Sequence, residues 1–139
     1  MDTKQLIDLL NQDLANELMA IMQYLHYAAR VDGPYRLVLR DFFSAEINEE
    51  KEHALYLAEK IITLGGDATC VPNAVPKVQG NKAMLEAVYE SELQAIHDYT
   101  ERSKQADSLG FKALSLKLEE FIVDETRHKE EVERLLKGW

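Results

Sequence analysis

The segment Glu50-Lys51-Glu52-His53 has a second copy of its pattern at Glu125-Thr126-Arg127-His128. Positions i and i+3 lie on one face of an α-helix, so in each segment the Glu and the His point the same way. Both pairs fall where the apolar stripe of a helix is expected. Around the first pair the inward positions read Leu39, Phe43, Glu46, Glu50, His53, Leu57, Ile61 and Leu64. Around the second pair they read Leu114, Leu118, Phe121, Glu125, His128, Val132 and Leu135.

Carboxylates and imidazoles in an apolar stripe are costly to bury unless something pairs with them. A metal ion would do so, and a ligand set of oxygen and imidazole suits iron, manganese or zinc. The alternative is two solvated helix faces with ordinary ion pairs, but Phe43, Leu57, Leu118 and Val132 share those faces. One Glu-x-x-His in a Glu-rich helical chain is a weak signal, whereas two copies in apolar stripes favour a metal site.

An internal repeat surrounds the two pairs. Glu17 lies 33 residues before Glu50, and Glu92 lies 33 residues before Glu125, so a shift of 75 residues superimposes the two halves. The same shift aligns Leu18 with Leu93, Ala20 with Ala95, Ile21 with Ile96, Tyr24 with Tyr99, and His53 with His128. The chain therefore reads as a two-helix unit used twice. Two helices with one Glu each and two with Glu-x-x-His each provide the ligand set of di-metal carboxylate bundles.

Composition limits the classes of protein to consider. With 139 residues, 46% hydrophobic and 29% charged, the chain is predicted to form one domain over residues 1–139 with a sizeable core. The net charge of −9 argues against nucleic-acid binding and suits a protein that attracts cations. No segment approaches the about 18 apolar residues of a membrane span. The N-terminus shows no signal peptide and Cys70 is single, so the expected location is the cytoplasm.

Apolar spacing of three and four residues predicts four helices and no strand. The expected ranges are about 2–31, 35–64, 81–108 and 111–137, with Asp2 or Thr3 capping the first helix and Asn81 capping the third. The second helix would be roughly 40 Å long. The linker between residues 65 and 80 can span about 50 Å, enough to cross the whole bundle. This predicts an all-α, up-down-down-up four-helix bundle with one long crossover.

Other polar side chains near the pattern carry weaker signals. Glu46 lies one turn before Glu50. It is interpreted as a carboxylate that caps the site or pairs with a base, with support of a ligand or a place on an entry path for metal as alternatives. Tyr24 and Tyr99 lie seven residues after Glu17 and Glu92. Each can hydrogen-bond a ligand carboxylate, be oxidised as an electron source, or be an ordinary core tyrosine with a satisfied hydroxyl. The groups not expected to bind metal are His26, His97, Cys70, and a solvated acidic face made of Asp124, Glu130, Glu131 and Glu133.

With these residues in place, the chain resembles the bacterioferritin and ferritin-like family. The similarity runs from about residue 9 to 136 and includes the segments 16–18, 49–54 and 124–128. The resemblance implies a cofactor of two iron ions, with manganese and zinc as alternatives. By that resemblance the metal ligands are the terminal Glu17 and Glu92, the bridging Glu50 and Glu125, and His53 and His128.

Three features depart from the bacterioferritin pattern. The Met that holds haem at a twofold interface is Lys51 here, a cavity-side His is Ala45, and no fifth helix follows before Trp139. Haem is therefore not expected. The fifth helix helps to build the fourfold contacts of the twenty-four-subunit cage, so a twelve-subunit shell and a simple dimer stay open as alternatives to that cage.

The resemblance implies a ferroxidase that oxidises Fe(II) with O₂ or H₂O₂ for iron storage or detoxification. One rival is a rubrerythrin-like peroxidase or manganese catalase on the same site, and another is a non-catalytic metal carrier. A homo-oligomer built from antiparallel twofold dimers is also expected, because apolar side chains extend beyond the core lines of the first two helices. These side chains are Leu14, Leu18, Ile21, Leu25, Tyr56 and Ile62.

Overall fold

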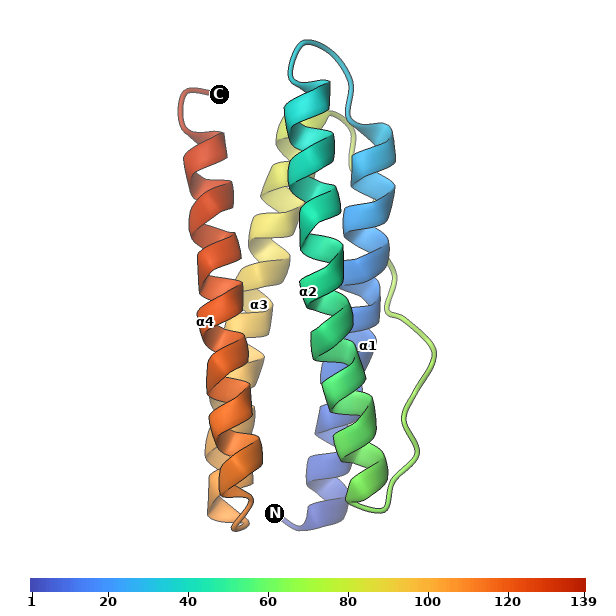
Figure 1. Ribbon diagram of the computed structural model, residues 1–139, viewed down its shortest axis with the longest axis vertical. Helices are drawn as coiled ribbons and strands as arrows, with labels where there is room; N and C mark the ends of the chain where they lie inside the picture. The colour runs from blue at the N-terminus through green and yellow to red at the C-terminus, as the bar shows by residue number, and fades with distance from the viewer.

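The computed structural model describes residues 1–139 and consists of four long helices. Their bounds are Thr3–Arg30 (α1), Arg36–Thr63 (α2), Asn81–Ser108 (α3) and Lys112–Leu136 (α4). Two short turns join α1 to α2 and α3 to α4, whereas a long segment joins α2 to α3 and runs the length of the bundle (Figure 1). The all-α, up-down-down-up bundle with one long crossover is therefore confirmed.

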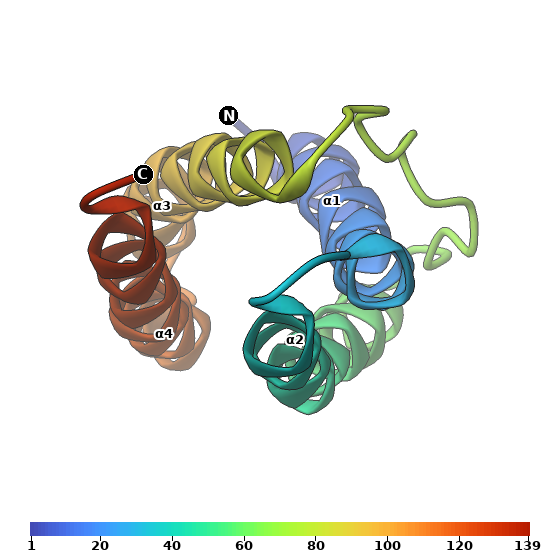
Figure 2. The same ribbon diagram turned by 90° about the horizontal axis from the view of Figure 1, so that it is seen from above.

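The crossover is held against α1 along its course (Figures 1 and 2). The Asn73 amide donates a hydrogen bond to the Ala15 carbonyl at 3.1 Å. Further along, the Tyr27 hydroxyl donates to the Pro76 carbonyl at 2.6 Å. These contacts satisfy backbone groups of an otherwise irregular segment, which explains how it keeps one path over the surface.

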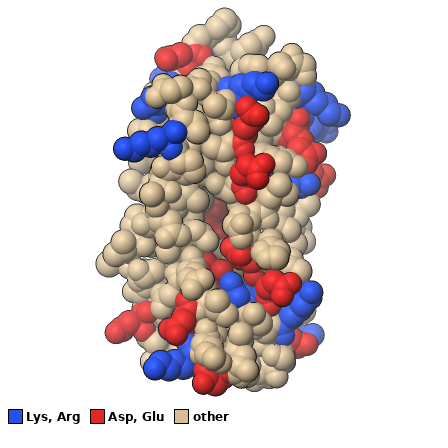
Figure 3. Space-filling model, turned by 180° about the vertical axis from the view of Figure 1, so that it is seen from behind, with Lys and Arg blue, Asp and Glu red and all other residues tan.

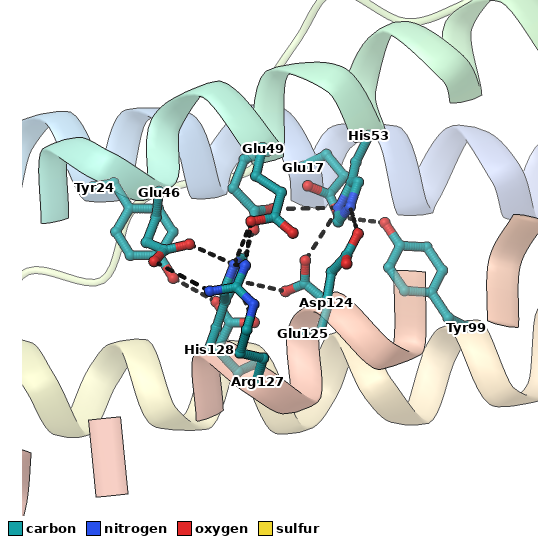
Figure 4. A network of polar contacts seen from close by, with 12 residues as sticks. Glu17, Tyr24, Glu46, Glu49, His53, Tyr99, Asp124, Glu125, Arg127 and His128 are labelled. Carbon is teal, nitrogen blue, oxygen red and sulfur yellow. Dashed lines mark hydrogen bonds and ion pairs between the residues drawn. The ribbon is translucent and has the colours of Figure 1, made fainter. Parts of the chain in front are cut away.

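The bundle consists of two helical hairpins that pack on each other. Helix α1 packs mainly on α2, α3 packs mainly on α4, and the hairpins meet where α1 lies beside α3 (Figure 2). Polar side chains bridge α2 and α4, as the hydrogen bond between His53 and Asp124 shows. The two Glu-x-x-His segments, on α2 and α4, therefore face each other across the bundle (Figure 4).

The hydrophobic core is divided into two clusters by charged residues. One cluster includes Leu6, Leu57 and Phe121, and the other includes Phe43, Leu85 and Val132. The predicted carboxylates and imidazoles lie between the two clusters, with apolar packing above and below. Such a layer requires compensation, because burying ionisable groups is unfavourable without partners.

The helix ends agree with the predicted bounds, with one difference at α3. At α1, Asp2 and Gln5 form a reciprocal capping box in which each side chain accepts from the other's backbone amide at 2.8 Å. Asn81, predicted to cap α3, instead lies inside the helix after Gly80, which has a φ of 92°. The Asn81 side chain bonds both backbone groups of Asp32, because it lies beside the turn between α1 and α2.

No helix in this structure combines the length and the apolar composition that a membrane span requires.

Candidate metal centre

Six predicted residues from all four helices meet in the middle of the bundle. They are Glu17 on α1, Glu50 and His53 on α2, Glu92 on α3, and Glu125 and His128 on α4. None of the six is more than 3% exposed. The sequence repeat placed these residues on inward faces, and the fold brings the inward faces of four helices together at one level.

The six residues form two overlapping sets that share two carboxylates. The ligand atoms of each set lie within 4.8 Å of one another. One set is Glu17, Glu50, His53 and Glu125, and the other is Glu50, Glu92, Glu125 and His128. Glu50 and Glu125 belong to both sets, so one carboxylate from α2 and one from α4 are placed to contact two neighbouring cations.

Several polar atoms of this centre lack hydrogen-bond partners, as expected of a site that binds cations. Seven buried oxygen and nitrogen atoms of these six residues have no hydrogen-bond partner. They are Glu17 Oε2, both oxygens of Glu50, Glu92 Oε2, Glu125 Oε1, and the Nδ1 atoms of His53 and His128. Unpartnered buried polar atoms are rare in native proteins and call for an explanation. Lone pairs of carboxylate and imidazole converging on two points match the ligands of iron, manganese or zinc.

Two tyrosines hold the carboxylates of Glu17 and Glu92. The Tyr24 hydroxyl on α1 donates to Glu92 Oε1 on α3 at 2.6 Å, and the Tyr99 hydroxyl on α3 donates to Glu17 Oε1 on α1. Each tyrosine therefore fixes the glutamate of the other hairpin. One oxygen of each glutamate is occupied by the tyrosine, and the other oxygen is left unpartnered.

The far nitrogen of each histidine is held by carboxylates on the α2–α4 face (Figure 4). His53 Nε2 lies 2.8 Å from Asp124 Oδ2. His128 Nε2 contacts Glu46 and lies 3.1 Å from Glu49 Oε2. Metal-binding histidines commonly donate their second N–H to a carboxylate, which fixes the tautomer and orients the ring.

Asp124 and Glu49 are the residues that the sequence analysis missed. Asp124 was assigned to a solvated acidic face, but that interpretation is wrong because its carboxylate bonds His53. Glu49 bonds His128 and Arg127. The 75-residue shift aligns Glu49 with Asp124, a signal that was available in the repeat itself. Glu46, expected to pair with a base, contacts His128 and lies 3.9 Å from Arg127.

Burial controls the protonation of the two shared carboxyls. Burial, and then the charge of Glu17, raise the pKa of Glu50 well above its ordinary value of 4.5. Burial, followed by the charges of Glu50 and Glu92, likewise raises the pKa of Glu125. Four carboxyls so close together cannot all ionise cheaply, so without a cation the centre retains protons.

The imidazoles respond in the opposite sense to burial. Burial alone would lower the pKa of His53, but the Glu17 carboxylate, 3.6 Å from His53 Nδ1, raises that pKa above its ordinary 6.5. The pKa of His128 is also raised, because Glu46 and Glu50 outweigh the effect of burial. The surrounding carboxylates therefore favour the protonated form of both imidazoles.

A small cavity reaches the centre between α1 and α3. Its volume is about 110 Å³, and Glu17, Glu50, Glu92 and Glu125 line it together with Ala20 and other residues. Recessed acidic atoms are visible near mid-height on this face of the molecule (Figure 3). The carboxylates that would bind a cation are thus within reach of a small molecule entering between these helices.

A buried ion pair lies one turn from Glu17. Arg102 donates to both Asp13 oxygens, at 2.8 and 3.1 Å, and these residues are 5% and 2% exposed. Burial raises the pKa of Asp13 to about 6, against the lowering effect of Arg102. This pair joins α1 to α3 beside the bond from Tyr99 to Glu17.

The remaining histidines and the cysteine lie outside the centre. His26, His97 and Cys70 are exposed and take no part in any cluster of metal-binding groups. That they do not bind metal stays a prediction.

Comparison with known proteins places the chain in a family. The ferritin-like domain matches residues 7–138, nearly the whole chain. The chain belongs to the ferritin-like family. A crystal structure described as ferritin-like, diiron-carboxylate proteins from Bacillus anthracis strain Ames is 49% identical and has a TM-score of 0.96, covering 99% of this chain and 100% of that one.

More distant structures share the fold of this ferritin-like chain. A dodecameric thioferritin, the bacterioferritin-related protein of Bacteroides fragilis, is 26% identical with a TM-score of 0.82, covering 98% of this chain and 86% of that one. A Dps protein from Bacillus brevis is 18% identical with a TM-score of 0.91, covering 99% and 100%. At that identity the likeness shows the fold alone. A comparison with curated proteins gives no match.

The tyrosine bonds lead to a prediction about the metal-free protein. Tyr24→Phe removes the donor to Glu92 and leaves a buried carboxylate oxygen without a partner. We expect the free energy of unfolding to fall by about 1–3 kcal/mol. Denaturant unfolding of the metal-free protein would measure this. Tyr35→Phe, at a 61% exposed tyrosine, is the control, and equal stability of the two variants would contradict the prediction.

Proposed function

We propose that this protein is a di-iron ferroxidase, which oxidises Fe(II) to Fe(III) with O₂ or H₂O₂ for iron storage or detoxification. The proposed iron ligands are Glu17, Glu50, His53, Glu92, Glu125 and His128. The observation that carries the proposal is the set of seven unpartnered buried ligand atoms, which come from these six residues and no others of the centre. They are arranged as two sets with two shared carboxylates.

The proposed roles follow from the positions of the side chains. Glu50 and Glu125 would each bridge the two cations, and Glu17 and Glu92 would each contact one. When bound, two adjacent Fe(II) ions supply two electrons together to one molecule of oxidant. The shared carboxylates give up their protons to bind and offset positive charge as Fe(II) becomes Fe(III). The bonds from Asp124 and Glu49 keep Nδ1 of each histidine turned inward.

The packing around the centre supports redox chemistry. Phe121 stacks on His53 with ring centroids 4.0 Å apart, and the two apolar clusters close the bundle above and below. Water therefore has limited access from the core side. Tyr24 and Tyr99 hold the terminal carboxylates in place, which preserves the geometry when a cation changes charge.

Anaerobic loading with Fe(II) followed by exposure to O₂ or H₂O₂ tests the proposal. A ferroxidase is expected to oxidise about two bound Fe(II) ions per chain rapidly to Fe(III). A metal carrier would bind Fe(II) without fast oxidation. A peroxidase or manganese catalase would turn over peroxide without accumulating mineral, and metal analysis after native expression separates manganese and zinc from iron. The likeness to structures described as diiron-carboxylate favours iron.

Assembly into a homo-oligomer of antiparallel twofold dimers is part of the proposal. The core accounts for some of the extra apolar line on α1, since Leu14 is buried and Leu18 and Ile21 pack against the core. Leu25 is nevertheless 55% exposed, and Ile62 on α2 is 62% exposed. The Bacteroides fragilis relative is described as dodecameric, which supports an assembly of some kind.

We expect a mass well above that of one 15.9 kDa chain at micromolar concentration. Light scattering coupled to size exclusion, with and without added iron, would measure the mass. Leu25→Lys is expected to weaken the assembly, because it places a charge on an apolar surface that a partner would cover. A monomeric mass for the unaltered protein would contradict the proposal.

Two further expectations stay predictions. Haem is not expected, because the protonated amine of exposed Lys51 has no lone pair to offer in place of a thioether. The cytoplasmic location also stays a prediction.

A further inference from the structure

The distances from the Nδ1 atoms of the two histidines to the central carboxylates follow the internal repeat closely. His53 Nδ1 lies 3.6 Å from Glu17, 3.9 Å from Glu50 and 3.1 Å from Glu125. His128 Nδ1 lies 3.7 Å from Glu92, 3.9 Å from Glu125 and 3.2 Å from Glu50. Equivalent distances agree within about 0.1 Å, so the two metal positions present the same ligands at the same spacing. A difference in affinity between them must come from outside the six residues.

The residues that contact the two histidines from outside the six-residue centre differ at one buried position of the repeat. The 75-residue shift aligns Glu46 with Phe121. Glu46 is 8% exposed and contacts His128 Nε2, whereas Phe121 is 3% exposed and stacks on the His53 ring. One histidine therefore has a buried carboxylate where the other has an uncharged aromatic ring.

The other charges near the histidines do not cancel this difference. Glu49 on His128 is matched by Asp124 on His53, as the repeat requires. Arg127 lies beside Glu46 and Glu49, and its Nη2 is 3.1 Å from His128 Nε2. Its side chain is 52% exposed, so solvent screens its charge more than that of Glu46.

Two further departures from the repeat add no net charge. The shift aligns Asp13 with Val88 and Arg102 with Tyr27. Asp13 and Arg102 bond each other as a buried pair of opposite charges near Glu17. Glu46 is therefore the buried charged side chain that distinguishes the surroundings of the two positions, and the half-exposed Arg127 lies 3.9 Å from it.

We propose that the two metal positions are inequivalent, that the position at His128 binds a divalent cation first, and that Glu46 sets this order. This inference rests on the proposed metal site. Glu46 acts as a positioning residue, because its carboxylate accepts a hydrogen bond from His128 Nε2. This bond makes Nδ1 a stronger metal ligand, and the carboxylate adds negative charge near the cation. Changes to such outer carboxylates typically alter metal affinity about 10–100-fold.

Anaerobic addition of Co²⁺ to the metal-free protein, followed by visible absorption, tests the order without any oxidation step. We expect two binding events that differ by more than the statistical factor for identical sites. His128→Ala should remove the tighter event, and His53→Ala should remove the weaker one. Glu46→Gln should weaken only the tighter event, by roughly tenfold or more, and Glu46→Asp should restore part of it.

Glu52→Gln is the matched control, because it makes the same change at an exposed glutamate of the same helix. It should leave both events unchanged. Two events of equal intrinsic affinity, an equal effect of Glu46→Gln on both, or loss of the tighter event in His53→Ala would each overturn the inference while leaving the metal site in place. Failure of the unaltered protein to bind Co²⁺ would overturn the proposed site as well.

Discussion

Replacing either shared carboxylate, by Glu50→Ala or Glu125→Ala, is expected to slow Fe(II) oxidation by more than about 100-fold. Each substitution removes a ligand from both metal positions at once, since each residue belongs to both sets. The loss should exceed that from Glu46→Ala, because Glu46 belongs to neither set and contacts one member of them, His128. Stopped-flow absorption after mixing Fe(II)-loaded protein with O₂ would measure the rate.

The same substitutions should not unfold the metal-free protein. Glu50 and Glu125 are buried among like charges, and an alanine relieves that repulsion while it leaves a small cavity. The metal-free variants should therefore melt at or above the temperature of the unaltered metal-free protein. Glu52→Ala, at an exposed position, serves as the control and should retain the full rate. Wild-type oxidation rates in both shared-carboxylate variants would show that the six-ligand assignment is wrong.

Filling both positions with metal is expected to stabilise the fold substantially. A ligand present at 100 times its Kd contributes about 2.7 kcal/mol, so two such sites contribute on the order of 5 kcal/mol if they bind independently. Binding should also release protons, because the pKa values of Glu50, Glu125, His53 and His128 are raised in the metal-free centre. Anaerobic Co²⁺ addition in weakly buffered solution with a pH indicator would count the protons.

The stabilisation should depend on pH in a defined direction. The two shared glutamates and the two histidines have a higher pKa in the folded protein than their ordinary values of 4.5 and 6.5. Their contribution to stability is fully present at pH values below the ordinary pKa, and it is lost as the pH rises through the raised pKa. The pKa of Glu17 is lowered, because the neighbouring Glu50 and His53 outweigh burial, so its contribution is lost only on acidification. Between about pH 6 and 8 the metal-free protein should therefore lose stability as pH increases.

Metal binding follows the opposite trend, because protons and cations compete for the same atoms. The difference in melting temperature between loaded and metal-free protein should widen from about pH 6 to 8. Differential scanning calorimetry at several pH values would measure it, and Glu125→Ala, with one shared carboxyl removed, should show a smaller widening. A difference that stays constant or narrows with rising pH, or metal uptake without proton release, would contradict the assigned protonation of the centre.

Much of the fold was predictable because local patterns point in one direction. The predicted helix bounds differ from the observed ones by at most one residue, since the breaks at Gly33-Pro34, Gly65-Gly66 and Gly110 are strong. The crossover topology followed from the length of the linker. Asn81 was wrongly predicted to cap α3. An Asn at the start of a helix can cap that helix, but the Asn81 side chain instead bonds the turn between α1 and α2.

By itself, the sequence determined that the six carboxylate and imidazole residues lie on inward faces, because helical periodicity assigns a side chain to a face. The 75-residue repeat further indicated that they form two equivalent groups. Only the tertiary structure decided what each group touches. Asp124 bonds His53, and Arg102 bonds Asp13, across 71 and 89 residues.

Such contacts depend on how far each helix is shifted and rotated relative to its neighbour. The residue pattern of a single helix does not determine this shift or rotation. A turn of one helix changes whether an acidic side chain meets solvent or a histidine, which is why Asp124 was assigned to the solvated face. The same rotation places Glu46 on His128 and Phe121 on His53, so the difference between the two positions arises where α2 and α4 meet.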